Sequence, residues 1–423
     1  MYLDEIVAAQ KRGEARGIVS VCSAHPWVLG TAMQEAPGAL LIEATCNQVN
    51  QVGGYTGMNP TAFMRYVRGI AGETQGALEK IILGGDHLGP SVWQYEKAES
   101  AMHKAETLIR EYVEAGFVKI HLDCSMRLAD DPAGAFNVEI SARRAARLAR
   151  VAETYGDEKL RYVIGSEVPL PGGVGDDEKD VRVTTVEDAQ QTIEATREAF
   201  LRQGLEAAWE RVVAVVVQPG VEFGDDFVFD YRPEAARGLV RTIESEPQLV
   251  YEAHSTDYQM PQGLRDLVRD HFAILKVGPA LTYAMREAIF ALAMMENELF
   301  PEAECSHLIQ TLDQVMLQHP EHWERYYHGA PGEQALKRKF SLSDRIRYYW
   351  PRAEVQLALD QLFGNLGGKP LPLSLVHQFL PVQAARIRLG SLKNDPLAIV
   401  RNKISSVLAD YFHACGPSLD SSI

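Results

Sequence analysis

Cysteine is scarce in this sequence and widely scattered. Five cysteines occur in 423 residues, and no two of them form a C-x-x-C pair. A sparse, odd set is typical of a reducing compartment and not of a disulfide framework. No apolar run reaches about 18 residues, so we expect no membrane span. The first residues have neither a basic start nor an apolar core, so we expect no signal peptide and a cytoplasmic location.

Basic residues are in deficit as well. The formal net charge is −15, from 42 Lys and Arg against 57 Asp and Glu. A nucleic-acid surface needs Lys and Arg to neutralise phosphates, so we expect no nucleic-acid partner. A locally basic phosphate pocket is still compatible with this charge.

Three common motifs are missing too. The sequence has no G-x-x-x-x-G-K-[ST] phosphate loop, no G-x-G-x-x-G after the first apolar run, and no G-x-S-x-G elbow. Kinase, dinucleotide-binding and α/β-hydrolase functions therefore lack the parts that their chemistry needs.

Short apolar runs alternate with amphipathic segments along the first part of the chain. Continuous apolar strands separated by helices indicate a parallel sheet that is buried on both faces. Eight such units over about 280 residues predict an α/β fold, a closed (β/α)8 TIM barrel and not an open doubly wound sheet. The runs are 18–22, 39–43, 80–83, 118–122, 162–164, 212–217, 249–251 and 273–277, and the helical segments include 101–115, 141–155, 186–203 and 261–270.

The domain division follows from the same pattern. Residues 283–299 are expected to form the closing helix of a barrel domain that spans residues 1–300. Residues 301–423 contain few β-like runs and several helical ones, which predicts a helical C-terminal extension packed on the barrel. The stretch 323–327 has the composition of core or lid.

Polar groups follow nearly every predicted strand. In a parallel barrel these strand ends converge on the face where barrel enzymes carry their chemistry. Packing alone does not require ionisable groups at all of these positions. They are Cys22 and His25, Glu43 with Asn47 and Gln48, Asp86 and His87, His121 with Asp123 and Ser125, Glu167, Gln218, Glu252 with His254, and Lys276.

Asp86 and His87 are the most informative pair. A His at a strand end can offer a ring nitrogen to a metal while the adjacent carboxylate carries a proton. A hydrogen-bonded Asp–His turn is the alternative. His254, at the equivalent end of the seventh strand, is the second expected imidazole ligand; a buried His satisfied by backbone groups is its alternative.

Two further carboxylates are candidates for catalysis. His121 precedes Asp123 by two residues, so the two could share a side, and we take Asp123 as the inward group. Glu167 stands before a Gly-rich loop and is assigned a catalytic or metal-binding role, with helix or loop capping as the alternative. For His25 a loop role suffices.

The remaining polar positions suit ligand binding. Glu43, Asn47 and Gln48 could hold sugar hydroxyls through paired donors and acceptors, and a salt bridge inside the barrel is the alternative for Glu43. Lys276 is expected to neutralise carboxylates or to meet a substrate phosphate. A Schiff base is disfavoured there because a metal would polarise the carbonyl instead.

Longer strings around these positions resemble one known family. They cover 21–26, 41–45, 53–58, 83–90, 119–126, 217–223, 252–259, 272–282 and 343–351, which is essentially the whole chain. On these strings the sequence resembles the GatZ/KbaZ/AgaZ family, usually described as the non-catalytic subunit of D-tagatose-1,6-bisphosphate aldolase.

The family is itself similar to class II, metal-dependent aldolases, which implies roles for several residues. Asp86 would transfer a proton and His87 would bind the metal, with Asp123 and Glu167 as nearby carboxylates and His254 as a further ligand. The resemblance thus implies a divalent metal (Zn, Mn, Ni or Co) held by His87, His254, Glu167 and Gln218.

The chain departs from the aldolases at two places. Gln218 stands where they have a metal-binding His, which alters the metal site. After His254 they have a Gly-rich phosphate loop, whereas this chain has Ser255-Thr256-Asp257-Tyr258, which disfavours a bisphosphate. Ser125, Ser255, Asp257 and Lys276 join Glu43, Asn47 and Gln48 as expected substrate contacts.

Three functions follow from the resemblance. The first is a D-tagatose/D-fructose 4-epimerase that cleaves and re-forms a C–C bond of a ketose or ketose phosphate, with the metal stabilising the enediolate. The second is a stabilising subunit of a class II D-tagatose-1,6-bisphosphate aldolase in galactitol or N-acetylgalactosamine catabolism. The third, a tagatose-6-phosphate kinase, lacks any nucleotide-binding motif. We favour the first, and expect a homo-oligomer.

Overall fold

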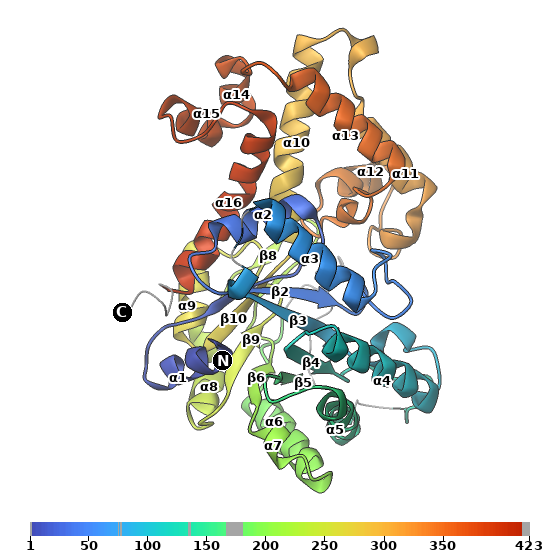
Figure 1. The fold of residues 1–423 in the computed structure, drawn as a ribbon, viewed down its shortest axis with the longest axis vertical. Helices are drawn as coiled ribbons and strands as arrows, with labels where there is room; N and C mark the ends of the chain where they lie inside the picture. The colour runs from blue at the N-terminus through green and yellow to red at the C-terminus, as the bar shows by residue number, and fades with distance from the viewer. Residues whose placement is uncertain (1, 75, 77, 134–136, 166–180, 417–423) are drawn as a thin grey trace.

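The computed structural model describes residues 2–74, 76, 78–133, 137–165 and 181–416 (Figure 1). Its centre is a closed barrel with the strand order β1-β10-β9-β6-β5-β4-β3-β2, and every neighbouring pair is parallel. Each strand overlaps one predicted run, so the predicted (β/α)8 barrel is confirmed. The strands are β1 (Ile18–Val21), β2 (Leu40–Thr45), β3 (Ile81–Leu88), β4 (Lys119–Asp123), β5 (Arg161–Gly165), β6 (Val212–Val216), β9 (Val250–Ala253) and β10 (Phe272–Val277).

Burial explains why these strands read as continuous apolar runs. All residues of six of the eight strands are buried. One face packs inside the barrel and the other lies under the surrounding helices, so neither face selects for polar residues. The helices are α2 (Pro26–Glu35), α3 (Pro60–Thr74), α4 (Ala98–Glu114), α5 (Val138–Tyr155), α6 (Val186–Arg202), α7 (Glu206–Trp209), α8 (Pro233–Glu244), α9 (Pro261–Arg269) and α10 (Pro279–Leu299).

One helix and one short pair of strands were not among the predicted elements. Helix α1 (Tyr2–Lys11) precedes β1, and its Leu3, Ile6 and Val7 pack on side chains from the barrel interior such as Leu41 and Val213. This helix closes the amino-terminal end of the barrel with apolar contacts. A short antiparallel pair, β7 (Glu222–Phe223) and β8 (Val228–Phe229), follows β6. The carboxyl-terminal end of the barrel is therefore the end left for a site.

The C-terminal part is helical, as predicted. Helix α16 returns to the barrel and packs against α2, α9 and α10 (Figure 1). Arg286 of α10 and Asp344 form a buried ion pair at 2.7 Å. The predicted boundary at residue 300 stays a prediction. The elements are η3 (Glu302–Glu304), α11 (Leu308–Gln318), η4 (Pro320–His322), α12 (Pro331–Phe340), η5 (Arg345–Tyr348), α13 (Ala353–Leu366), α14 (Leu373–Phe379), α15 (Pro381–Arg388) and α16 (Pro396–Ala414).

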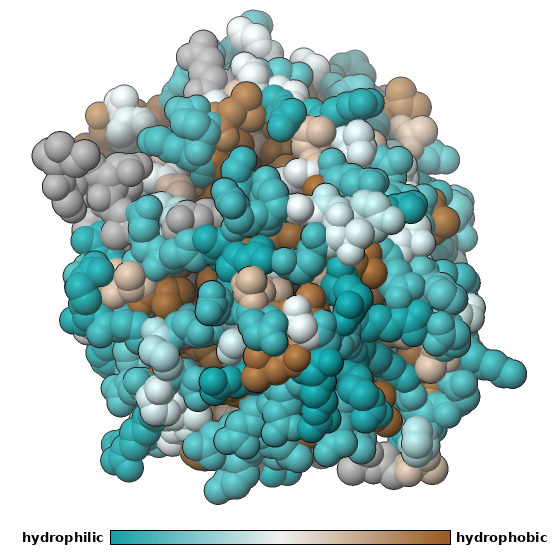
Figure 2. Space-filling model, turned by 60° about the horizontal axis from the view of Figure 1, so that its bottom comes forward, coloured by the Kyte–Doolittle hydropathy of each residue, from teal (hydrophilic) through white to brown (hydrophobic). Residues whose placement is uncertain are grey.

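The surface agrees with the composition. The face drawn in Figure 2 is mainly hydrophilic, with small hydrophobic areas separated by polar ones. Among the residues that the structure describes, no helix is both long enough and apolar enough to cross a bilayer.

Candidate functional site

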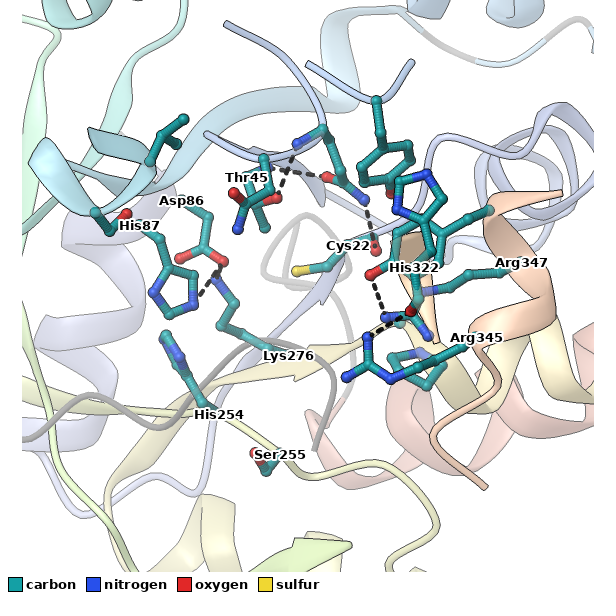
Figure 3. A pocket seen from close by; sticks show the side chains of 18 of the residues that line it. Cys22, Thr45, Asp86, His87, His254, Ser255, Lys276, His322, Arg345 and Arg347 are labelled. Carbon is teal, nitrogen blue, oxygen red and sulfur yellow. Dashed lines mark hydrogen bonds and ion pairs between the residues drawn. The ribbon is translucent and has the colours of Figure 1, made fainter. Parts of the chain in front are cut away.

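An irregularity in β3 brings Asp86 and His87 to the barrel mouth together. Consecutive side chains of a regular strand point to opposite faces. The pairing of β3 with β4 shifts its register between Gly85 and Leu88, and His87 has a left-handed φ of 49°. This local bulge lets both side chains line one cavity (Figure 3).

The glycines around this pair are required by close approach. A Cβ on Gly84 would lie 2.6 Å from Glu43 Oε1, and a Cβ on Gly89 would lie 1.7 Å from the carbonyl oxygen of Asp123. A larger residue at Gly84 would therefore displace a buried carboxylate. At Gly89 it would separate β3 from the end of β4.

Asp86, His121, Glu252 and His254 form a compact cluster of potential ligands. Each offers one ligand atom, and these atoms all lie within 4.8 Å of one another; no other group of this kind occurs among the described residues. His121 Nδ1 lies 2.9 Å from Asp86 Oδ1, and His254 Nε2 lies 2.9 Å from Glu252 Oε1. His121 Nε2 is buried and has no hydrogen-bond partner among the residues that the structure describes.

The buried charges around the cluster also indicate a metal site. Lys119 contacts Glu43 Oε1 at 2.5 Å and Glu252 Oε2 at 2.7 Å, while Lys276 contacts Glu43 at 3.0 Å and also pairs with Asp86. Among the described residues, the buried carboxylates outnumber the two ammonium groups and the His87 ring, where burial lowers the pKa but Asp86 and Asp123 raise it further. The four carboxylates are Glu43, Asp86, Asp123 and Glu252. Uncompensated buried charge is costly. The orphaned His121 nitrogen and this charge balance fit a divalent metal.

The protonation of these groups agrees with a ligand role. Burial, with Lys276 nearby, lowers the pKa of His254 to about 3, so its ring is neutral at physiological pH. A neutral imidazole is the form that binds metals. Burial alone would raise the pKa of Asp86, but His87 and Lys276 outweigh it and hold the carboxyl ionised.

Two of the four predicted metal ligands, His87 and His254, lie at or beside the cluster. His254 belongs to the cluster, and His87 lies beside it with its ring centre 4.9 Å from that of His254. His87 Nδ1 lies 2.8 Å from Asp123 Oδ2, and its Nε2 lies 3.5 Å from Asp86. A carboxylate on Nδ1 is the arrangement that orients a His ligand through its other nitrogen. His87 stays a predicted ligand.

Gln218 and Glu167 are not placed with this group. Gln218 Oε1 accepts hydrogen bonds from the backbone N–H groups of Gly220 at 2.8 Å and Val221 at 3.0 Å, and its side chain does not line the cavity. Glu167 lies outside the described residues. Their assigned roles remain predictions from the family resemblance.

A cavity of about 490 Å³ opens above the cluster, within the range of about 300–1,000 Å³ that small-molecule sites occupy. Asp86, Asp123 and His254 line it together with six of the seven predicted substrate contacts; those six are Asn47, Gln48, Ser125, Ser255, Asp257 and Lys276. Glu43 instead lies beneath the cavity, fully buried, and accepts a hydrogen bond from Ser20 at 2.6 Å. The structure thus places Glu43 in the salt-bridge arrangement that was its alternative.

Sequence reasoning gave too little weight to three residues here. Glu252 precedes His254 by two residues and Lys119 precedes His121 by two, so strand alternation places each pair on one side. The alternation of side chains along β4 and β9 therefore predicts that Lys119, His121 and Glu252 point into the barrel. His121 was ranked below Asp123, yet both point inward for the same reason. No comparable signal placed Arg345, Arg347 and His322 of the C-terminal extension at the same cavity.

The fold and the site together define a (β/α)8-barrel protein with a His and carboxylate cluster at the carboxyl ends of its strands. A family model described as "D-tagatose-1,6-bisphosphate aldolase subunit GatZ/KbaZ-like" matches residues 3–416, and the chain belongs to this family. Membership ties it to tagatose-bisphosphate aldolase-related function.

A solved structure of high identity has the same fold. A crystal structure described as a probable tagatose 6 phosphate kinase from Sinorhizobium meliloti 1021 is 46% identical, with a TM-score of 0.87, over 95% of this chain and 100% of that chain. The fructuronate-tagaturonate epimerase UxaE from Cohnella laeviribosi is 12% identical with a TM-score of 0.49, covering 94% of this chain and 81% of that one. This second likeness is too low to carry an argument about activity.

Proposed function

We propose that the protein is a metal-dependent ketose 4-epimerase of the D-tagatose/D-fructose type. The observation that carries the proposal is the cluster of Asp86, His121, Glu252 and His254 at the base of a cavity of about 490 Å³. Its donor set and its excess of negative charge suit a divalent cation. Such a cation, when bound, polarises the ketose carbonyl and stabilises the negative charge that develops on cleavage.

The chain's own carboxylates would move the proton. Asp86 and Asp123 both line the cavity, and His87 lies between them. One carboxylate takes the proton of the C4 hydroxyl, the C3–C4 bond breaks with its electron pair left on C3, and C4 becomes an aldehyde. After the aldehyde rotates, the bond re-forms on its other face and the same proton returns to the C4 oxygen. No oxidant or reductant is consumed.

Polar side chains around the cavity would hold the two fragments during the rotation. Gln48 is fixed by a hydrogen bond from the Thr45 N–H at 2.9 Å, and Ser125 donates to Asp123 Oδ1 at 2.6 Å. These side chains are pre-positioned by contacts within the protein, which keeps the cost of orienting the substrate low.

The family description supports a second function, a non-catalytic subunit that stabilises a class II tagatose-bisphosphate aldolase. A purely structural subunit has no evident use for four buried carboxylates and two buried lysines at a cavity floor, because such groups tend to cost stability. This argument favours intrinsic chemistry over a support role.

The test is to incubate the purified chain alone with D-fructose or D-tagatose, loaded in turn with Mn²⁺, Ni²⁺, Zn²⁺ or Co²⁺. We expect the 4-epimer by ¹³C NMR, and its loss in Asp86→Asn and His254→Ala. His103→Ala is a matched control, since His103 is exposed on α4 and lies outside the cavity. If neither the free ketoses nor their 6-phosphates are converted with any metal, and the chain raises the activity of an added class II aldolase even as Asp86→Asn, the subunit role holds.

A further inference from the structure

The cavity has a second charged wall, supplied by the C-terminal extension. His322, Arg345 and Arg347 line it opposite Asp86, His87 and His254 (Figure 3), and Arg325 lies on its exposed rim. One wall therefore carries carboxylates and imidazoles from the barrel, and the other carries arginines from residues 320–348.

Arg345 is a buried cation with no carboxylate partner among the described residues. Its exposed fraction is 3%, and its Nε atom is buried with no hydrogen-bond partner. Its guanidinium lies 3.0 Å from the ring centre of Tyr326, and Nη1 donates to the His322 carbonyl at 3.3 Å. Burial lowers the pKa of Arg345, with no opposing ion pair to hold it up. Such a cation is unfavourable unless an anion meets it.

The other buried arginines of the described chain are paired. Each of the three forms an ion pair with an aspartate at 2.5–2.7 Å; the pairs are Arg144 with Asp131, Arg286 with Asp344, and Arg338 with Asp313. Arg345 is thus the one buried arginine among the described residues that has no ion pair.

Arg347 adds a second guanidinium beside it. Arg347 donates to the carbonyls of Ser343 and Asp344 and to the Tyr348 hydroxyl at 2.8 Å, and among the described residues it has no ion pair within 4.0 Å. The Asp344 carboxylate is already taken by Arg286 and by a hydrogen bond from Thr282.

The two acidic side chains on this side of the cavity are engaged elsewhere. Asp257 accepts from the N–H groups of Gly278 and Ala280, and burial raises its pKa to about 6 although Arg347 lowers it somewhat. Glu321 pairs with Arg352 at 3.2 Å. Neither carboxylate supplies the missing counter-charge.

We infer that Arg345 and Arg347, with Arg325 at the rim, bind the phosphate group of a ketose monophosphate. This inference rests on the proposed function, because chemistry at C3 and C4 holds that part of the sugar at the metal cluster. The far end, C6, then faces the arginine wall. Guanidinium groups bind phosphate through paired hydrogen bonds. A site with two or more guanidinium groups suits a phosphate dianion better than it suits a ligand with a single carboxylate group.

The position of Lys276 limits the substrate to one phosphate. Lys276 lines the cavity but is engaged with Asp86, Glu43 and Glu252, so it offers no free charge at the C1 end. The loop after His254, Ser255-Thr256-Asp257-Tyr258, carries no basic side chain, which agrees with a single phosphate site at the opposite wall.

The experiment measures binding by isothermal titration calorimetry to the full chain with D-fructose, D-fructose 6-phosphate, D-fructuronate and inorganic phosphate. We expect the phosphorylated ketose to bind at least tenfold more tightly than fructose. Arg347→Met and Arg325→Met should each remove a large part of that advantage, so that the ratio of the two affinities falls toward one. Arg345→Met should remove most of it, and circular dichroism checks its folding because Arg345 is buried. Arg352→Met is the matched control, since Arg352 lies on the same extension outside the cavity lining.

Equal affinities for fructose and its 6-phosphate in the unmodified protein would overturn the inference, as would tighter binding of fructuronate than of the phosphate. The failure of the proposed function is separable. If the 6-phosphate binds in an arginine-dependent way but is not epimerised, the phosphate site stands and the 4-epimerase does not. If fructose is epimerised and the 6-phosphate binds no more tightly than fructose, the 4-epimerase stands and the phosphate site does not.

Discussion

His121 Nδ1 lies 2.9 Å from Asp86 Oδ1, across two neighbouring strands of the barrel. The contact orients His121, which belongs to the cluster with His254 and Glu252 and whose other ring nitrogen is buried without a hydrogen-bond partner among the described residues. It also fixes Asp86, which is held on its other oxygen by Lys276. The first two predictions concern this pair.

Metal content should depend on both imidazoles of the cluster. We expect His121→Ala and His254→Ala each to lower affinity for a divalent metal by about 10–100-fold or more, because each removes a ligand or an orienting group. Metal bound after dialysis is measured by mass spectrometry. His103→Ala, on the exposed face of α4, should keep the unmodified metal content. Unchanged metal in both cluster variants would contradict this site.

Removing the Asp86 carboxylate should abolish most of the epimerase activity while the protein still folds. Asp86→Asn keeps the shape of the side chain but loses the proton acceptor and one partner of Lys276, so we expect epimerisation to fall about 10²–10⁴-fold. Thermal unfolding should still be a single cooperative transition. Turnover is followed by NMR with saturating metal, so that weaker metal binding is not mistaken for lost proton transfer. Activity within a few-fold of the unmodified protein would exclude Asp86 as the proton carrier.

The buried lysine of β4 should stabilise the barrel. Lys119 is fully buried between Glu43 and Glu252. Lys119→Met leaves Lys276 as the remaining cation beside these two carboxylates, and a broken buried pair costs about 3–5 kcal/mol. Urea unfolding measures the loss. The double variant Lys119→Met, Glu252→Gln should recover part of it, and a double variant that is no more stable than the single one would argue against a charge effect.

Asp257 should make stability depend on pH. Burial raises its pKa to about 6 in the folded state, from 3.8. The folded chain then holds a proton that the unfolded chain has lost, so this contribution is present below pH 3.8 and is lost as the pH rises through about 6. Two pH units correspond to about 2–3 kcal/mol.

Asp257→Asn should lack this dependence, because its side chain does not titrate. We expect the unfolding free energy of the variant minus that of the unmodified protein to increase between pH 4 and pH 7 and to level off above it. Urea unfolding at half-unit pH steps gives the difference. A flat difference across this range would show that Asp257 titrates at its ordinary pKa.

The part of the site that lies at strand ends could be predicted from the sequence. Parallel strands of a barrel have their carboxyl ends on one face, which predicts that Asp86, His254 and Lys276 share one cavity, as they do. The bulge at His87 was not predictable, because it depends on the register between β3 and β4 and not on either strand alone. The burial of Glu43 under the cavity likewise depends on Lys119 and Lys276 from other strands.

The amino-acid sequence by itself determined the barrel, its eight strands, the helical C-terminal part and the face that carries polar groups. Those properties follow from local periodicity, which every segment carries within itself. Only the tertiary structure decided that His121 and Glu252 join Asp86 and His254, and that Arg345 reaches the same cavity unpaired. Such contacts join side chains that lie far apart along the chain, and they arise only when the barrel closes and α10 and α16 hold the extension over its mouth.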